Sequence, residues 1–238
     1  MKAICLICFN PSKIWCKFLN NFIKYKVFMI VDDNTKKLTI FKNNYKNITF
    51  LQINNIFCIN YGYTNMNFTI NKLVSGWEKA ILYFSIEHKY FDHIWFIEDD
   101  VFFYDEQTIE NIDKQYLYDD LLSNSYDTNI DGNSNEWHWN KININYFPPY
   151  YNGMMCIIRL SQKMLDCIHN YANKNKTLFF LEALFPTIAI KNNLIYNTPP
   201  EFNEIHYRKN FEIKNISKNI LYHPIKNLYE HSFYRKNL

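Results

Sequence analysis

The feature that most constrains this chain is a run of three acidic residues, Glu98-Asp99-Asp100, between two apolar segments. Residues 93–97 indicate a buried strand, so the acids stand at its carboxyl end. Three like charges this close repel one another, which favours either a solvated turn or a cation between them. Ligands of open α/β sheets bind outside the carboxyl ends of the strands, and this position therefore favours a cation.

The segments around the acidic run alternate between strand-like and helix-like patterns, as in a parallel α/β unit. Ser75 and Glu78 have the spacing of a capping box for the helix before the acidic strand. The elements expected along the chain are strands over 2–9, 25–31, 48–53, 93–97 and 154–159, and helices over 12–22, 71–89, 161–171 and 178–190.

A second acidic pair, Asp32-Asp33, follows the strand expected over 25–31. The carboxyl ends of neighbouring parallel strands face one crevice, so this pair should lie near the first acidic run. Two acidic groups at one rim predict a site for a metal ion and a diphosphate.

Composition excludes several classes of nucleotide-binding protein. The chain has four glycines and none are clustered, so it lacks the phosphate loop of a Rossmann dehydrogenase or a P-loop NTPase. Its 26 Lys and Arg against 23 Asp and Glu leave a net charge of +3, too small an excess for a nucleic-acid-binding protein. Hydrophobic residues make up 48% of the 238 residues, and no repeat or linker divides them, so we expect one domain over 1–238.

The cysteines and the N-terminus indicate a cellular compartment. Cys5 and Cys8 have CxxC spacing, but no second pair completes a zinc site, so we expect buried free thiols. The N-terminal apolar run is too short for a signal peptide, and no stretch reaches the ~20 apolar residues of a membrane span. We therefore expect a cytoplasmic protein with no membrane span.

The strand followed by Glu98-Asp99-Asp100 resembles the Asp-x-Asp motif of the GT-A-fold glycosyltransferases, which use nucleotide-sugar donors. The resemblance extends loosely from residue 1 to about 235. It implies one α/β domain with a Rossmann-like, mixed but mainly parallel sheet flanked by helices. The nucleotide-binding half would span about 1–104, and the acceptor-binding half with the C-terminal tail about 105–238.

The same resemblance implies roles for the acidic residues. In that family the first acid reaches the donor ribose or sugar, and the last holds Mn²⁺ or Mg²⁺ on the diphosphate. Glu98 would take the first role and Asp100 the metal role, with Asp99 between them in the donor site. Glu98 departs from the family pattern, which has Asp at this position.

A late His completes the metal shell in many GT-A enzymes. His223 is the candidate, and His231 is the rival ligand. Lys226 is placed to bind a diphosphate oxygen. Lys79, at the start of the helix before the acidic strand, would line the donor pocket, although most such residues only pack.

Glu182 stands among apolar residues in the segment 178–186. Burial would raise the pKa of its carboxyl toward the range of a general base, which an inverting enzyme needs to activate the acceptor hydroxyl. A structural acid that caps the helix or pairs with a neighbour is the equal alternative.

Residues 118–146 form a polar segment that indicates a functional loop, interrupted by Trp137-His138-Trp139. The two indoles suit either the stacking of an acceptor sugar or a hydrophobic anchor for the loop. Gly153, before the strand expected over 154–159, would let the backbone approach a ligand closely.

The resemblance implies a metal-dependent hexosyl or related transferase that moves a sugar from a nucleoside-diphosphate sugar to a glycan, a protein-linked sugar or another hydroxyl acceptor, as in glycan biosynthesis. One alternative is an inactive glycan-binding or structural protein with the same fold. Another is a sugar-nucleotide nucleotidyltransferase, which generally needs a Gly-rich loop where this chain has Phe9-Asn10-Pro11-Ser12. The abundance of Asn, Lys, Ile, Tyr and Phe is typical of an AT-rich genome, such as that of a large DNA virus.

Overall fold

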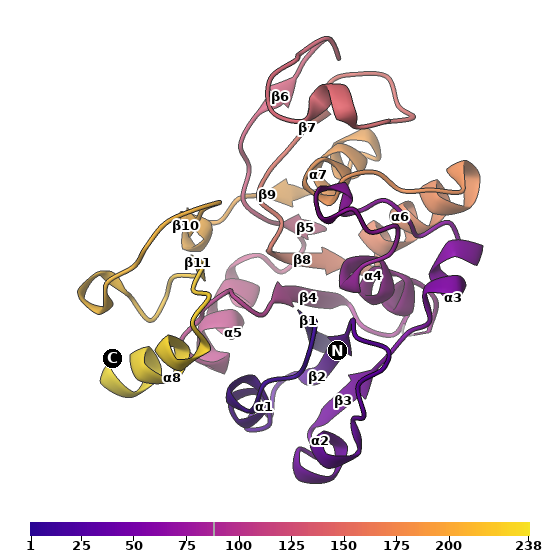
Figure 1. Ribbon diagram of the computed structural model, residues 1–238. Helices are drawn as coiled ribbons and strands as arrows, with labels where there is room; N and C mark the ends of the chain where they lie inside the picture. Colours follow the sequence, from indigo (N-terminus) through magenta and orange to yellow (C-terminus); the bar gives the residue numbers. More distant parts are fainter. Residues whose placement is uncertain (88) are drawn as a thin grey trace.

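The computed structural model describes residues 1–87 and 89–238 and is built around a seven-stranded sheet (Figure 1). The strand order is β3-β2-β1-β4-β8-β5-β9, in which β3, β2, β1 and β4 are parallel. β8 runs antiparallel to both of its neighbours. The strands are β1 (Lys2–Cys8), β2 (Lys26–Val31), β3 (Ile48–Leu51), β4 (His93–Glu98), β5 (Leu121–Leu122), β8 (Ile157–Ser161) and β9 (Tyr196–Asn197).

The mixed, mainly parallel sheet expected from the sequence is confirmed, and its central strands are covered on both faces. Cys5 of β1 pairs in register with Phe28 of β2 on one side and Phe96 of β4 on the other. All three side chains are buried. Strands buried on both faces need continuous apolar runs, and the sequence has them here.

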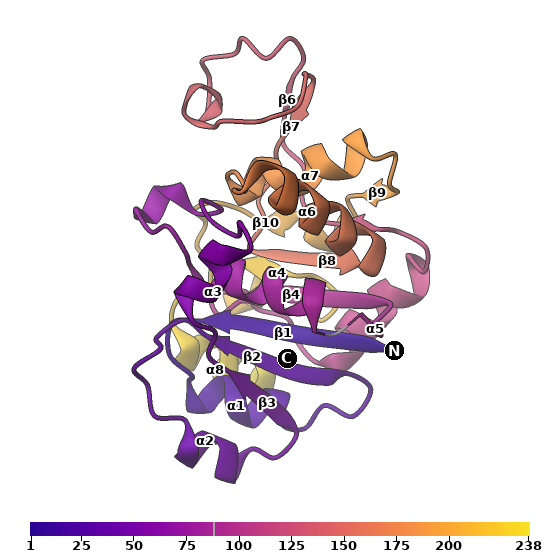
Figure 2. The ribbon, with the colours of Figure 1, turned by 90° about the vertical axis from the view of Figure 1, so that its right-hand side faces the viewer.

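Helices form a layer on each face of the sheet (Figures 1 and 2). α4, α6 and α7 contribute to the apolar core on one face, and α1 and α5 to the core on the other. The helices are α1 (Lys13–Leu19), α2 (Thr39–Asn44), α3 (Asn55–Asn60), α4 (Gly76–Ile86), α5 (Glu106–Gln115), α6 (Gln162–Asn175), α7 (Leu181–Lys191) and α8 (Leu228–Asn237). No described helix has the length and apolar character needed to span a membrane.

α4 begins at the edge of the sheet where the parallel strands end. The Ser75 hydroxyl accepts a hydrogen bond from the Trp77 amide (3.2 Å), and the Glu78 carboxylate accepts one from the Ser75 amide (2.7 Å). This capping box was expected, but the helix is shorter than 71–89, and residue 88 lies outside the described part of the chain. A Cβ on Gly76 would fall 2.6 Å from Ile7 Cγ2, so glycine lets the first turn lie against β1.

The segment expected to be one polar loop, 118–146, is partly a strand. Leu121-Leu122 enters the central sheet as β5 between β8 and β9. A two-residue strand is too short to give a periodic signal, which is why the sequence did not reveal it. Beyond β5 the chain forms an arm that projects from the molecule (Figure 2), with a small ladder of β6 (Thr128–Asn129) and β7 (Tyr150–Tyr151) at its base.

A buried ion pair ties α5 to the sheet. The Arg159 guanidinium of β8 lies 2.7 Å from the Asp113 carboxylate of α5, and neither side chain is exposed. Asp113 also accepts hydrogen bonds from the Tyr25 hydroxyl (2.5 Å) and the Trp95 indole (3.2 Å). These partners keep the carboxylate satisfied in an apolar core.

The C-terminal tail folds back against the segment that follows β4. Its short elements are η3 (Pro200–Phe202), β10 (Glu204–Ile205), η4 (Ile213–Asn215) and β11 (Tyr222–His223). Phe102 and Tyr222 exchange backbone hydrogen bonds of 2.8 and 2.9 Å. Arg235 of α8 stacks over the Phe18 ring at 3.5 Å and donates to the Phe103 carbonyl oxygen (3.0 Å). The tail is thereby fixed next to the acidic run.

Candidate active site

Three potential metal ligands meet where β4 and β11 end. Glu98, Asp100 and His223 each offer one ligand atom, and these atoms lie within 4.8 Å of one another. We call these three residues the triad. His223 Nε2 lies 3.4 Å from Asp100 Oδ1. Among the described residues, this is the one such cluster of three or more acidic, His or Cys side chains.

Backbone contacts aim His223 at the carboxylates. The ladder between Phe102 and Tyr222 brings β11 beside the acidic run, and the Ile225 amide donates to the Asp100 carbonyl oxygen at 2.7 Å. His223 Nδ1 lies 2.6 Å from the His206 carbonyl oxygen, so Nδ1 carries a proton that it donates there. Nε2 is then left to face the carboxylates, as in a metal-ligating His oriented by a backbone acceptor.

Burial and repulsion between neighbouring carboxylates shift pKa values in the acidic run. Burial, with the neighbouring Asp100 second, raises the pKa of Glu98 to about 7, although the Trp77 indole donates to its carboxylate at 2.6 Å. The same two causes raise the pKa of Asp99 to about 6. Burial lowers the pKa of His223, but its contact with Asp100 outweighs this and leaves the pKa above its usual value.

The triad fits a hard divalent cation. Asp100 Oδ1 is buried and has no hydrogen-bond partner among the described residues, and an ion would satisfy it. Two carboxylates and one imidazole form a ligand set that suits Mn²⁺ or Mg²⁺. A cation there would also offset the repulsion that perturbs Glu98 and Asp99.

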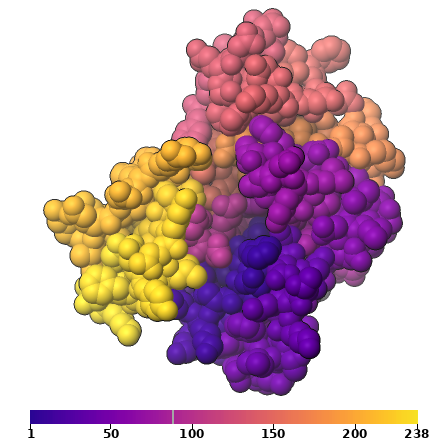
Figure 3. Space-filling view, viewed as in Figure 1, coloured from indigo at the N-terminus to yellow at the C-terminus, as the bar shows by residue number. Residues whose placement is uncertain are grey.

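Two connected hollows lie beside the triad at the carboxyl edge of the sheet. The inner hollow, about 250 Å³, is lined by all three acidic residues and by the first turn of α4. The outer hollow, about 500 Å³, lies against the end of β2 and the start of α3. Both share Phe9, Asp32 and Lys72, so they form one continuous cleft. The molecular surface is hollowed between the tail and the segment before α4 (Figure 3).

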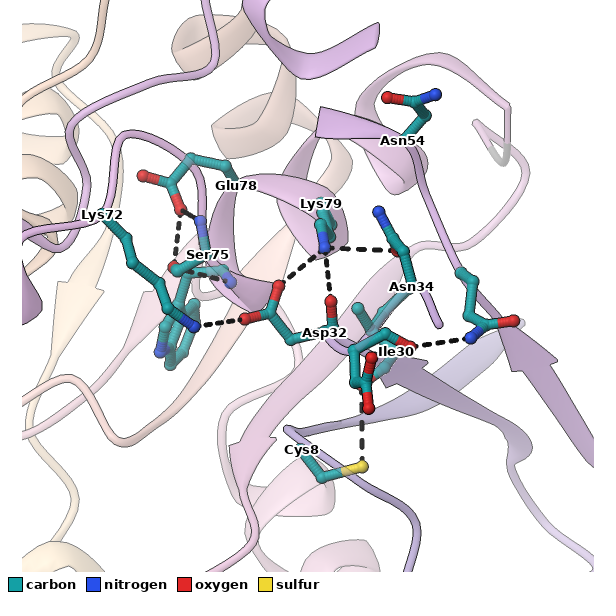
Figure 4. Close-up of polar contacts among 12 residues, drawn as sticks. Cys8, Ile30, Asp32, Asn34, Asn54, Lys72, Ser75, Glu78 and Lys79 are labelled. Atoms are coloured by element: carbon teal, nitrogen blue, oxygen red, sulfur yellow. Dashed lines mark hydrogen bonds and ion pairs between the residues drawn. The ribbon is translucent and has the colours of Figure 1, made fainter. Parts of the chain in front are cut away.

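Asp32 holds two lysines at the junction of the hollows (Figure 4). Its carboxylate accepts from Lys79 Nζ (2.7 Å) and from Lys72 Nζ (3.1 Å). The Lys79 side chain is only 1% exposed and also contacts Asn34, so its ammonium is already bound within the protein. Lys72, at 45% exposed, is the cation that faces both hollows. Lys72 was not expected here from the sequence, because it stands among mixed polar and apolar residues and belongs to no motif.

Asp33 lines the outer hollow and is held in a tight turn. Its carboxylate accepts from the Thr35 hydroxyl (2.6 Å) and the Thr35 amide (2.9 Å). These bonds lower the pKa of Asp33 below its usual value. Asp32 and Asp33 therefore both face the cleft, but neither belongs to the triad.

The structure separates the two tail histidines. His231 is fully buried, donates Nε2–H to the Ile225 carbonyl oxygen (2.8 Å) and packs edge-on against Trp15. Burial lowers its pKa to about 4. It stands outside the triad, so the geometry favours His223 as the ligand. Lys226 is not brought to the acidic run and lines a different groove on the tail.

Glu182 lies in the first turn of α7 with its side chain partly buried. Burial raises its pKa to about 7, with a further rise from the charge of Glu98. Its carboxylate has no hydrogen bond or ion pair within the described part of the chain, and no side chain caps α7. The contacts therefore do not support the structural alternative, in which Glu182 caps the helix or pairs with a neighbouring residue.

Packing within the protein accounts for the two tryptophans of the arm and for Gly153. Trp137 lies over the Phe180 ring with centroids 5.6 Å apart, and Trp139 is buried, so both anchor the arm to the body of the protein. A Cβ on Gly153 would fall 2.1 Å from the Asn124 carbonyl oxygen. The close approach at this glycine is to the chain itself.

Comparisons with known proteins add information on the fold. No protein-family model matches the sequence, and no curated protein resembles it. The galactosyltransferase LgtC, solved with donor and acceptor sugar analogs, superposes with a TM-score of 0.51 at 10% identity, over 100% of this chain and 96% of that one. The 4-diphosphocytidyl-2C-methyl-D-erythritol synthase of Anaerococcus prevotii superposes with a TM-score of 0.50 at 9% identity, over 99% and 96%. The fold is of the GT-A type. At these identities the likeness concerns the fold alone.

Proposed function

We propose that this protein is a metal-dependent glycosyltransferase that takes a sugar from a nucleoside-diphosphate sugar. The observation that carries the proposal is the triad at the end of β4, which opens into a two-part cleft. The triad supplies hard ligands for a cation, and the cleft offers an elongated space for a nucleotide. The GT-A fold supports the same reading, since LgtC is a galactosyltransferase of this architecture.

The metal ion would be held by Asp100 and His223, with Glu98 beside it. When bound, it would neutralise the charge that develops on the departing diphosphate. Lys72 would add a second positive charge at the junction of the hollows. It can leave Asp32 for a phosphate because Lys79 remains as a partner of the Asp32 carboxylate. The first turn of α4 also faces the inner hollow, and a helix N-terminus favours anions. Lys226 lines a groove that shares no lining residue with the cleft, so the diphosphate contact expected of it is not part of this proposal.

Glu182 is the proposed general base. A pKa near 7 lets a carboxylate accept a proton at neutral pH, and this one has no competing partner. The charge of Glu98 raises the pKa of Glu182 and the charge of His223 lowers it, so both residues are near enough to Glu182 to influence its carboxyl. In an inverting reaction Glu182 takes the proton of the acceptor hydroxyl as that oxygen attacks the sugar.

A sugar-nucleotide nucleotidyltransferase is the second candidate, favoured by the likeness to the Anaerococcus synthase. It would bind a nucleoside triphosphate and release pyrophosphate. Incubation with nucleoside triphosphates plus sugar phosphates, beside a panel of nucleoside-diphosphate sugars, separates the two activities. Release of pyrophosphate would favour this candidate, and release of a nucleoside diphosphate the transferase.

Calorimetry with UDP and GDP tests the proposal directly. We expect at least one of them to bind in the presence of Mn²⁺ and to lose affinity in EDTA. His223→Ala should lower the affinity far more with Mn²⁺ than in EDTA. An absence of any metal-dependent nucleotide binding would instead indicate an inactive protein that retains the fold.

A further inference from the structure

A second groove lies on the C-terminal tail and shares no lining residue with the cleft. We call it the tail groove. It has a volume of about 780 Å³, and its walls are residues 208–211 on one side and 224–227 with Glu230 on the other. This volume is within the range of ligand pockets in proteins.

The tail groove is joined to the triad through the backbone. Pro224, in its wall, directly follows His223. Ile225, in the same wall, donates its amide to the carbonyl oxygen of Asp100 at 2.7 Å. One wall of the tail groove is therefore built on the same stretch of backbone that holds His223 and Asp100 in place.

Positive charge gathers in the tail groove. Arg208, Lys209 and Lys226 line it against one carboxylate, Glu230. Lys209 pairs with Glu204. Arg208 and Lys226 are exposed and form no ion pair with any described residue, so both cations are available to a ligand.

The aromatic surface of the tail groove is already covered. Lys209 Nζ lies 5.4 Å from the centroid of the Phe211 ring, and Tyr222 packs edge-on against that ring at 5.1 Å. Stacking on a free aromatic face is one way in which proteins bind neutral sugars, and the contacts of Phe211 leave it poorly placed for this. Its selectivity must come from charge and from amide groups such as that of Asn210.

We propose that the tail groove binds an anionic glycan, a sugar chain with sulfate, phosphate or carboxylate groups, as the acceptor substrate. This inference rests on the proposed function, because an acceptor must reach a sugar held at the metal site. Arg208 and Lys226 recognise the anionic groups, and Pro224, the wall residue that directly follows His223, links the groove to the triad. Lys226 then serves the acceptor and not the donor diphosphate.

The test measures binding of a heparin-derived hexasaccharide to the full chain by calorimetry at low and high salt, beside neutral maltohexaose. The sulfated sugar should bind and the neutral one should not, and the affinity should fall with added salt. Arg208→Gln and Lys226→Gln should each weaken binding by about tenfold, the loss of one charged hydrogen bond. Lys226→Arg keeps the charge and should bind normally. The control Lys236→Gln makes the same charge change on an exposed residue outside the groove and should have no effect.

Mn²⁺-dependent UDP or GDP binding is measured on the same variants to separate this inference from the proposed function. Unchanged nucleotide affinity in Arg208→Gln and Lys226→Gln supports a separate acceptor site. An equal loss of nucleotide and glycan binding would assign the groove to the donor and overturn the proposal, as would equal binding of maltohexaose. Binding to phosphatidylserine vesicles but not to the sulfated sugar would also overturn it. If glycan binding depends on both cations while no nucleotide binds the wild type, the groove assignment holds and the transferase proposal fails.

Discussion

Replacing Asp100 by Asn should give a protein that is at least as stable as the wild type without metal and less stable than the wild type with metal. The ligand atoms of Glu98 and Asp100 lie within 4.8 Å of each other. Two unit charges at that distance repel by about 1 kcal/mol in water and by about 3.5 kcal/mol at an effective dielectric constant of 20. The variant loses this repulsion, but it also loses the contact with His223, worth about 1 kcal/mol. The difference is at most about 2.5 kcal/mol, and Glu98, with a pKa of about 7, carries only part of its charge at neutral pH. Without metal the variant should therefore be as stable as the wild type or more stable by up to about 2 kcal/mol.

Thermal unfolding in EDTA and in Mn²⁺ plus nucleoside diphosphate measures both states. A chain of this length shifts its Tm by about 2–4 °C per kcal/mol, so the variant should unfold at the same temperature or up to about 8 °C higher in EDTA. Ligand at 100 times its Kd stabilises the wild type by about 2.7 kcal/mol, or about 5–10 °C, and should leave the variant unchanged. Asp131→Asn, an exposed acid on the arm, is the control and should follow the wild type in both conditions. A lower Tm of Asp100→Asn in EDTA, or equal stabilisation by Mn²⁺, would refute the reasoning.

Three further predictions concern the tail, the proposed base and the core. His223→Ala should abolish stabilisation by Mn²⁺ and also lower the Tm in EDTA, because it removes the bond to the His206 carbonyl oxygen and the contact with Asp100. His231→Ala should lower the Tm in EDTA, because it removes the bond to the Ile225 carbonyl oxygen, but should keep the stabilisation by Mn²⁺; loss of that stabilisation in His231→Ala alone would exchange their roles. Glu182→Gln should keep nucleotide binding and lower turnover by ~10²-fold. Because its pKa is about 7, the Glu182 carboxyl loses its proton as the pH rises through 7. The kcat of the wild type should therefore increase over this range, and the kcat of the Gln variant should not. Undiminished turnover in the variant would favour a retaining reaction without this base. Arg159→Met should lower the free energy of unfolding, measured with denaturant, by about 3–5 kcal/mol, because it leaves the buried Asp113 carboxylate without its closest cation. A loss below about 1 kcal/mol would contradict that account.

The parts of the fold with long apolar runs could be predicted from the sequence. β1, β2 and β4 were expected within one residue of their ends, because strands buried on both faces carry a continuous signal. α4 was expected from its capping box, although not its length. Two elements escaped for different reasons: α5 presents a mostly polar surface, and β5 has only two residues.

The candidate site was predictable where its residues are adjacent in the sequence. Glu98 and Asp100 belong to one run, and their position at a strand end already indicated a ligand site. That His223 and not His231 reaches them depends on the backbone ladder at Phe102, which no sequence pattern encodes. The sequence pointed to Lys79 and not to Lys72 as the lysine of the donor pocket, and only the side-chain exposure and the contacts with Asp32 show that Lys79 is the enclosed ammonium.

The ladder between Phe102 and Tyr222 also affects when the site can form during synthesis. All seven strands of the central sheet end by Asn197, so its backbone ladders are complete before β11, and the tail residues that join its core, Phe202, Ile205 and Leu221, also precede residue 222. A nascent or truncated chain that stops before residue 222 can therefore form the sheet and expose Glu98 and Asp100 without their third partner. Under the proposed function, uptake of metal would then be a late event, and we expect resistance to proteolysis in Mn²⁺ to distinguish the full chain from a fragment with the same sheet.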